Sequence, residues 1–258
     1  MNIIKKTLPI FLLVFSCNLL FAWAETGHRV IGEVAAQNIK KRTARKIKKL
    51  TNYQSLAMMS TFGDEIKSDD RYKKFYTWHF VNFDLGTKYE DSKINANGDI
   101  YQAINFCIAT IKDEKSSDDD KIFYLKMLIH FVGDLHQPLH IGHESDQGGN
   151  EIKLKWFGQP TNLHRVWDEN MIDKYNMSYT ELAHNLPYKT CDEIEKIQSG
   201  TIADWMYESQ NLATKVYAST KADENLSYKY QYDYFPMVKT QLKNAGYRLA
   251  KILDDLFS

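Results

Sequence analysis

The 258-residue chain contains 33 basic and 33 acidic side chains, so it has no excess of positive charge. Nothing in this balance resembles the strongly basic face with which proteins bind duplex DNA by counterion release. Glycine and proline are scarce, at 12 and 5 residues, and the length is sufficient for one large core. We therefore expect a single, mostly α-helical domain.

Residues 1–22 have the pattern of a secretory signal peptide. Lys5 and Lys6 precede a mostly apolar run from Leu8 to Ala22, which is short for a membrane span. An uncleaved signal anchor is the alternative. No later stretch is apolar enough to span a membrane, so we expect export to the periplasm or the extracellular space.

Two cleavage positions compete. The small-residue rule favours a cut before Glu25, whereas a cut after Ala22 satisfies only part of the rule. The second cut leaves Trp23 as the N-terminus, and its free amino group and carbonyl oxygen can then chelate one metal ion. We expect this cut, because the metal site described below requires it, and the mature domain then spans residues 23–258. Lipidation at Cys17 is a third and poorer option.

Most of the mature chain shows helical spacing of apolar residues. Residues 40–49 are rich in lysine and arginine and are best explained as an exposed helix face. Residues 140–160 hold four glycines and a proline, which predicts a long loop with a short hairpin near residues 151–157. Helices are expected at residues 27–50, 99–113, 120–136, 163–175, 190–219 and 227–257.

Two cysteines, Cys107 and Cys191, remain after cleavage. In an exported protein they can form one disulfide. Two free, buried cysteines are an equal alternative. Nothing in the sequence indicates oligomerisation, so a monomer is expected.

Two pairs of histidine and aspartate repeat one spacing, His130 with Asp134 and His164 with Asp168. Positions four apart lie on one face of a helix, so each pair can present an imidazole and a carboxylate to one metal ion. Ligands of these two types, without cysteine, indicate a hydrolytic metal site rather than a structural zinc site.

The run HFVGDLHQPLH offers three ligands within a short stretch. Pro138 ends the helix that carries His130 and Asp134, so His140 can turn back toward a neighbouring metal ion. Asp134 has two carboxylate oxygens and can bridge two metal ions at the separation of roughly 3.5–4 Å that is typical of two-metal phosphoesterases.

Six motifs together resemble the zinc-dependent, single-strand-specific nucleases, a group that includes the fungal nucleases S-one and P-one and plant and bacterial relatives. The resemblance runs from Trp23 to about the C-terminus and implies a multi-helix fold similar to that of zinc phospholipase C. The motifs are WxxxGH at Trp23–His28, FGDEIK around Asp64, WHFVN around His79, HFVGDLHQPLH, GGN at Gly148–Asn150 and LHRVWD at Leu163–Asp168.

The family's pattern implies three zinc ions as cofactors. One zinc takes Asp64, His79, His130 and Asp134. A second takes the amino and carbonyl groups of Trp23, with His28 and Asp134. A third takes His140, His164 and Asp168.

The implied reaction is hydrolysis of single-stranded DNA and RNA to 5′-mononucleotides by attack of a metal-activated water on phosphorus. Removal of the phosphate from 3′-nucleotides is a related activity, and no covalent intermediate or stable duplex binding is expected. The residues implied in catalysis are Asp64, Asp134, Lys67 and Asn150.

The same resemblance implies a nucleotide pocket. Phe80 matches the aromatic residue on which a base stacks, Lys67 a basic residue near the phosphate, and Asn150 an amide near the scissile group. Asn82 replaces an aspartate that binds the base edge in fungal members, so their base preference does not carry over. Core packing of Phe80 and a solvated surface position for Lys67 are the alternatives.

Two other functions compete. Zinc phospholipase C has a similar cluster with an N-terminal tryptophan, but its last ligand is glutamate, where this chain has Asp168. A secreted zinc-binding protein without catalysis needs the ligands but not Phe80, Lys67 and Asn150. The nuclease function is preferred, because both the ligand set and the pocket residues match it.

Overall fold

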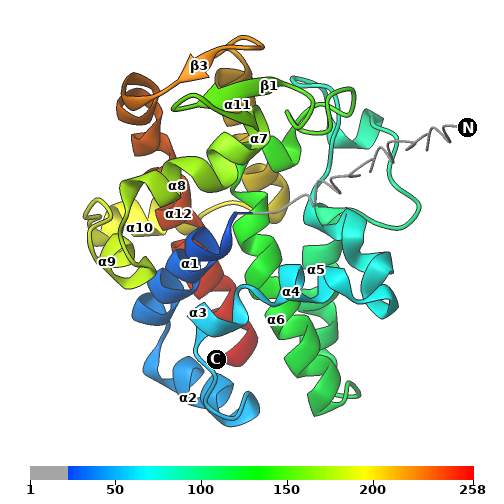
Figure 1. Ribbon diagram of the computed structural model, residues 1–258. Helices are drawn as coiled ribbons and strands as arrows, with labels where there is room; N and C mark the ends of the chain where they lie inside the picture. Colours follow the sequence, from blue (N-terminus) through cyan, green and yellow to red (C-terminus); the bar gives the residue numbers. More distant parts are fainter. Residues whose placement is uncertain (1–22) are drawn as a thin grey trace, which may run out of the picture.

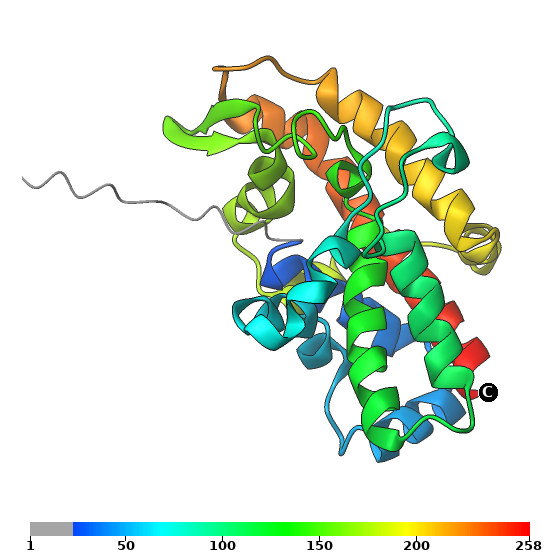
Figure 2. The same cartoon turned by 90° about the vertical axis from the view of Figure 1, so that its right-hand side faces the viewer.

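A computed structural model describes residues 23–258; the signal peptide predicted at residues 1–22 lies outside the described residues. The described chain is mostly helical, as predicted, with a small sheet at the end of the molecule opposite α2 (Figures 1 and 2). None of the helices within residues 23–258 combines the length and the apolar character that a membrane span requires.

The elements, including 3-10 helices (η1–η4) and one π-helix (η5), follow in this order: α1 (Glu25–Asn38), α2 (Lys41–Leu50), α3 (Leu56–Met59), α4 (Phe62–Glu65), η1 (Ile66–Ser68), η2 (Asp70–His79), η3 (Tyr89–Asp91), α5 (Ile100–Lys112), α6 (Asp118–Leu135), η4 (Pro138–Ile141), β1 (Lys153–Trp156), β2 (Gln159–Asn162), α7 (Leu163–Arg165), η5 (Val166–Asn170), α8 (Met171–Tyr175), α9 (Tyr179–His184), α10 (Cys191–Gln198), α11 (Ile202–Tyr217), β3 (Asn225–Leu226) and α12 (Tyr228–Phe257).

Helix α6 lies beside α5 (Figure 2) and also packs against α12, α4 and α1. It begins after Ser117, whose side chain accepts a hydrogen bond from Asp120 N at 3.1 Å, and three aspartates in its first turn interact favourably with the helix dipole. Residues 127–135 are all buried, as expected of a helix that is covered on every side. The half of α6 that carries His130 and Asp134 is therefore held firmly by its neighbours.

A buried polar contact links α6 to the C-terminal helix α12. The Nδ1–H of His136 donates to Val132 O at 2.7 Å, and its Nε2 accepts from Arg248 Nη1 at 3.0 Å. Burial, together with the Arg248 charge, lowers the pKa of His136 to about 3, so the ring remains neutral at neutral pH. His136 therefore connects α6 with α12.

Two of the predicted helices are each divided in two. The helix expected at residues 27–50 breaks at Ile39, where the backbone is extended with a ψ of 150°. The helix expected at residues 190–219 breaks at Gly200, which has a φ of +88°, and Thr201 then starts α11 with a capping box. The basic residues of α2 are exposed, as predicted for a solvated helix face.

The predicted hairpin is present but extends further along the chain. Strand β1 pairs antiparallel with β2, and the turn between them, Phe157–Gly158, has φ values of +50° and +81°. Two left-handed residues are what a two-residue type I′ turn requires, although phenylalanine is unusual there. Strand β3 adds a third, parallel strand that the sequence analysis did not predict.

Of the two alternatives for the cysteines, the structure has the free form. Both Cys107 and Cys191 are free; Cys107 is buried in α5, whereas Cys191 is exposed at the start of α10. Burial raises the pKa of the Cys107 thiol above its usual range. The alternative of two free cysteines therefore holds, although only one of them is buried.

Candidate metal centre

The eight predicted ligands that carry histidine or aspartate side chains come together in the structure. They form three groups, and within each group the ligand atoms lie within 4.8 Å of one another. The groups are His28, His130 and Asp134; Asp64, His79 and His130; and His140, His164 and Asp168. Segments that are far apart in the sequence thus supply one continuous cluster.

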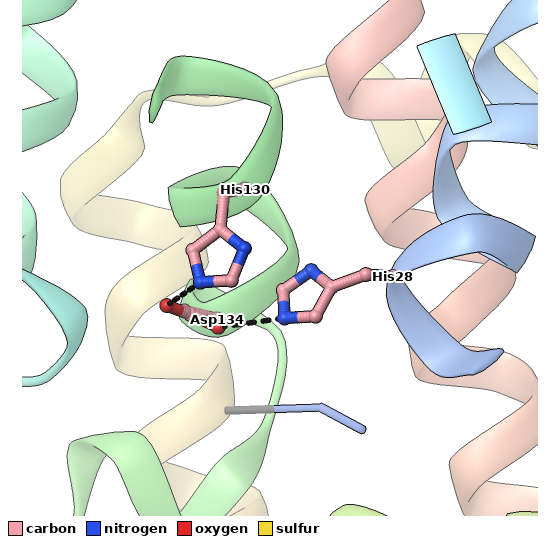
Figure 3. Close-up of side chains that lie close together, drawn as sticks. All are labelled: His28, His130 and Asp134. Atoms are coloured by element: carbon pink, nitrogen blue, oxygen red, sulfur yellow. Dashed lines mark ion pairs between the residues drawn. The ribbon is translucent and has the colours of Figure 1, made fainter. Parts of the chain in front are cut away.

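Asp134 lies between the first two groups. Its Oδ1 is 3.2 Å from His28 Nε2, and its Oδ2 is 2.8 Å from His79 Nδ1 and 3.2 Å from His130 Nε2. Figure 3 shows His28 and His130 pairing with different oxygens of the carboxylate. This division of the two oxygens is the arrangement that a carboxylate needs in order to bridge two metal ions.

Asp64 approaches the same group from α4. Its Oδ1 lies 3.5 Å from His130 Nε2, 4.0 Å from His79 Nδ1 and 2.7 Å from Lys67 Nζ. The Lys67 side chain is only 12 % exposed, so the alternative of a solvated surface lysine is wrong. Burial opposes the ionised form of Asp64, but His130 and Lys67 hold its pKa at about 2.

The third group lies where a helix deviates from α-helical geometry. His164 is in α7 and Asp168 in the π-helix η5, and His164 Nε2 is 3.6 Å from Asp168 Oδ2. His140 Nε2 is 3.8 Å from Asp168 Oδ1, which also accepts a hydrogen bond from Gln137 Nε2 at 3.1 Å. π-Turns inside helices frequently occur at functional sites.

Three of the imidazoles are fixed by a hydrogen bond to a backbone oxygen. Such a bond from Nδ1–H sets the orientation of the ring and leaves Nε2 available for a metal ion. The pairs are His130 with Ser60 O (2.7 Å), His140 with His79 O (2.7 Å) and His164 with Gly148 O (2.8 Å).

Two glycines make space for the rings. A Cβ atom added at Gly133 would lie 2.8 Å from His28 Nδ1, and one added at Gly63 would lie 2.4 Å from His130 Cδ2. Both distances are shorter than a non-bonded contact permits. These positions therefore require glycine because the imidazoles approach the backbone closely, a role that the sequence analysis did not assign.

We expect Gly133→Ala to lower the bound metal while the chain stays helical. Alanine favours a helix over glycine by about 1 kcal/mol, so α6 should persist, but the new methyl group must displace His28. Metal content measured by mass spectrometry and helix content measured by circular dichroism test this together. An unchanged metal content would show that His28 can shift without losing its role.

Trp23 is fully buried at the start of the described chain. Its indole Nε1–H donates to Gly133 O at 2.9 Å, and the next amide, Ala24 N, donates to Asp168 O at 3.0 Å. These bonds tie Trp23 and Ala24 to α6 and to η5, the two elements that supply Asp134 and Asp168.

The cluster has the properties of a metal site. His140 Nε2 is buried and, among the described residues, has no hydrogen-bond partner; the buried His28 Nε2 and Asp134 Oδ1 lie 3.2 Å apart and have no other hydrogen-bond partner. Burial lowers the pKa of His140 to about 3 and that of His79 to about 4, so these rings keep their lone pairs at neutral pH. Burial raises the pKa of Asp168 well above its usual range. Divalent cations would supply the missing positive charge, and this donor set suits zinc.

A pocket of about 260 Å³ opens beside the cluster. Phe80, Asn82, Lys67 and Asn150 all line it, so the structure brings the four predicted pocket residues together. Phe80 is only half-buried, which argues against simple core packing. The other lining residues are Tyr76, His79, Leu139, His140, Glu144, Gln147 and His164.

Sequence reasoning missed several residues of the site. Gln137 is fully buried and donates a hydrogen bond to Asp168, which fixes the orientation of that carboxylate. It lies within the motif HFVGDLHQPLH, and a polar residue among so many apolar ones could have indicated this role. Tyr76 packs edge-on against Phe80, with ring centroids 6.2 Å apart. Glu144 lies in the predicted loop, where no periodic pattern marks its role.

Comparisons with known proteins agree with this geometry. The family model described as S1/P1 Nuclease matches residues 23–258. Endonuclease 3 of Arabidopsis thaliana is 30% identical over 92% of this chain and 89% of its own length. Nuclease S1 of Aspergillus oryzae is 26% identical over 92% of each chain.

Among solved structures, an alpha toxin from Clostridium absonum is 15% identical, with a TM-score of 0.46 over 92% of this chain and 67% of the toxin chain.

The match to the family model extends over the entire described chain, including every predicted ligand. The chain therefore belongs to the S1/P1 nuclease family and is a nuclease.

Proposed function

We propose that the chain is an exported endonuclease that uses three zinc ions to hydrolyse single-stranded DNA and RNA to 5′-mononucleotides. We also propose that it removes the phosphate from 3′-nucleotides. The proposal rests mainly on one observation: three groups of histidine and aspartate side chains lie together beside a pocket that Phe80 lines.

The proposed ligands follow the family's pattern. Asp64, His79, His130 and Asp134 would hold one zinc; the amino and carbonyl groups of Trp23, with His28 and Asp134, a second; and His140, His164 and Asp168 a third. Bound zinc lowers the pKa of water from about 15.7 toward 7 and polarises phosphoryl oxygens. The free amino group requires cleavage of the signal peptide after Ala22.

Two side chains next to the cluster, Lys67 and Asn150, support hydrolysis of a phosphodiester. The Lys67 ammonium, 2.7 Å from Asp64 Oδ1, provides positive charge where a phosphoryl oxygen would lie. Lys67 and Asn150 line the same pocket, so both groups can orient the scissile phosphate. No side chain is needed as a nucleophile.

The pocket supports a preference for single strands. A base can stack on Phe80 only if it is free of its partner strand, and stacking tolerates any base. With 31 basic and 33 acidic side chains after residue 22, the chain also has little general attraction for duplex DNA. We therefore propose local binding of a few nucleotides by a monomer.

We expect Phe80→Ala to raise the KM for single-stranded DNA by about tenfold, because a stacked base contributes about 1–3 kcal/mol. Zinc should stay near three ions per chain. Phe106→Ala, which removes a half-exposed ring of α5 outside the pocket, is the matched control and should change neither value. Loss of metal in Phe80→Ala would instead indicate a structural role.

The proposed function is tested by incubating the purified chain beginning at Trp23 with single-stranded DNA, before and after zinc chelation. A phosphatidylcholine substrate is run in parallel. Release of 5′-mononucleotides that chelation abolishes, with intact lipid, is the expected result. Cleavage of the lipid with intact DNA would favour the phospholipase alternative, and no reaction on either substrate would favour a zinc-binding protein without catalysis.

A further inference from the structure

The chain between α6 and η4 passes through a buried glutamine. Gln137 follows the end of α6, and its side chain is inaccessible to solvent. Its backbone N donates to Asp134 O at 3.0 Å, and its backbone O accepts from His140 N at 3.0 Å. The main chain of Gln137 is therefore bonded to two of the proposed ligands.

The side chain of Gln137 makes two further hydrogen bonds, one at each end of its amide. Oε1 accepts from Leu139 N at 2.6 Å, and Nε2 donates to Asp168 Oδ1 at 3.1 Å. A backbone N–H can only donate and an ionised carboxylate can only accept, so the amide fits in one orientation. A reversed amide would bring two donors together at Leu139 and two acceptors together at Asp168.

These bonds join two of the segments that supply the third group of the cluster. The bond to Leu139 N caps the start of η4, the short 3-10 helix that carries His140. The bond to Asp168 holds a carboxylate that belongs to η5. One buried amide thus connects the element of His140 with the side chain of Asp168.

The neighbouring imidazoles do not hold the Asp168 carboxylate by themselves. Its Oδ1 lies 3.8 Å from His140 Nε2 and its Oδ2 lies 3.6 Å from His164 Nε2, and both separations exceed a hydrogen bond. Gln137 fixes Oδ1 through a neutral donor. A lysine or arginine in its place would add a positive charge that repels a bound cation, whereas an amide leaves the charge of the carboxylate for the metal ion.

We propose that Gln137 is a positioning residue that assembles the third zinc site before the ion binds. It keeps the Asp168 carboxylate turned toward His140, so that this ligand does not have to become ordered when zinc arrives. The inference rests on the proposed function, because it takes His140, His164 and Asp168 as the ligands of one zinc ion. Loss of a partner that bonds a metal ligand typically lowers metal affinity by about 10–100-fold.

The test is zinc binding by Gln137→Met, which keeps a side chain of similar length but removes both the donor and the acceptor. We expect the affinity for one ion to fall by about 10–100-fold while the other two ions are retained. At a chelator concentration that leaves the wild type fully loaded, mass spectrometry should find about two zinc ions per chain instead of about three. Excess zinc should restore the third ion together with the hydrolysis of single-stranded DNA.

Gln137→Ala is a second variant that keeps the test decisive if methionine prevents folding. It leaves space for a water molecule to bond Leu139 N, so the chain should fold. A water molecule does not fix the carboxylate of Asp168 as the amide does, so the same ion should be lost. Circular dichroism checks that the helix content of both variants equals that of the wild type.

Gln241→Met is the matched control. Gln241 is also buried, and its Nε2 donates to His136 O at 2.9 Å, so it supports the same end of α6 without contacting a proposed ligand. This variant should lower the melting temperature but keep the zinc content of the wild type at the same chelator concentration.

Three results would overturn the inference. They are equal zinc affinity in Gln137→Met and wild type, loss of all three ions in Gln137→Met, and loss of zinc in Gln241→Met, which would indicate a general effect of packing. A wild type that never binds three zinc ions would instead contradict the proposed function on which the inference rests.

Discussion

Replacement of Asp134 by alanine should reduce bound zinc from about three ions per chain to about one and lower single-strand hydrolysis by at least about a thousandfold, equivalent to about 4 kcal/mol of activation free energy. The reason is the division of its carboxylate, whose Oδ1 faces His28 and whose Oδ2 faces His79 and His130. One substitution removes a ligand that two proposed ions share. Each of these two ions would lose a carboxylate oxygen, and the close pair would lose the negative charge that lies between two positive ions.

Asp99→Ala is the matched control for this variant. Asp99 is also buried, but it accepts hydrogen bonds from Tyr89 OH at 2.7 Å and from Gln102 N at 3.1 Å at the start of α5. Its loss should cost about 1–2 kcal/mol of stability as a helix cap and leave the zinc content unchanged. Loss of a single zinc in Asp134→Ala would contradict the bridging role.

The second large effect concerns the N-terminus. A chain that starts at Glu25 should lose zinc and most activity, because it lacks Trp23, whose indole bonds Gly133 O, and Ala24, whose amide bonds Asp168 O. This truncation also removes a fully buried side chain, which by itself costs about 3–5 kcal/mol. A loss of activity could thus reflect packing alone.

A chain that starts at Ala22 separates the two causes. It keeps the Trp23 ring and its hydrogen bonds but converts the amino group of Trp23 into an amide, which is a poor metal ligand. We expect this form to fold with an unchanged melting temperature after chelation, yet to bind about one zinc fewer than the form that starts at Trp23. Equal zinc content and activity in the two forms would remove Trp23 from the ligand set.

Local spacing was sufficient to predict the ligand pairs. His130 with Asp134 and His164 with Asp168 are each four positions apart, and a helical backbone fixes their relative positions without help from the rest of the chain. The second pair, however, spans two elements: His164 is in the short α-helix α7, whereas Asp168 is in the π-helix η5. The spacing of apolar residues does not distinguish an α-helix from a π-helix here. A π-helix has one more residue in its turn, and whether it forms depends on how the neighbouring elements pack.

Helix ends were predicted less well, and the sequence left the state of the two cysteines open. The breaks at Ile39 and Gly200 lie within segments whose apolar spacing is continuous, so the pattern alone favoured longer helices. Cys107 and Cys191 are in different helices, and their separation in space depends on the packing of α5 and α10. Two cysteines in a sequence do not specify this distance.

The sequence by itself determined the mostly helical class and the histidines and aspartates that gather in the cluster, because helical periodicity and metal-ligand chemistry are properties of residue type and local spacing. Only the tertiary structure decided how these side chains are arranged: that Asp134 divides its oxygens between two groups, that Gly63 and Gly133 admit the imidazoles, and that Phe80, Asn82 and Asn150 line one pocket. These features depend on contacts between segments that are distant along the chain. Close packing fixes such contacts, and no local pattern in the sequence records them.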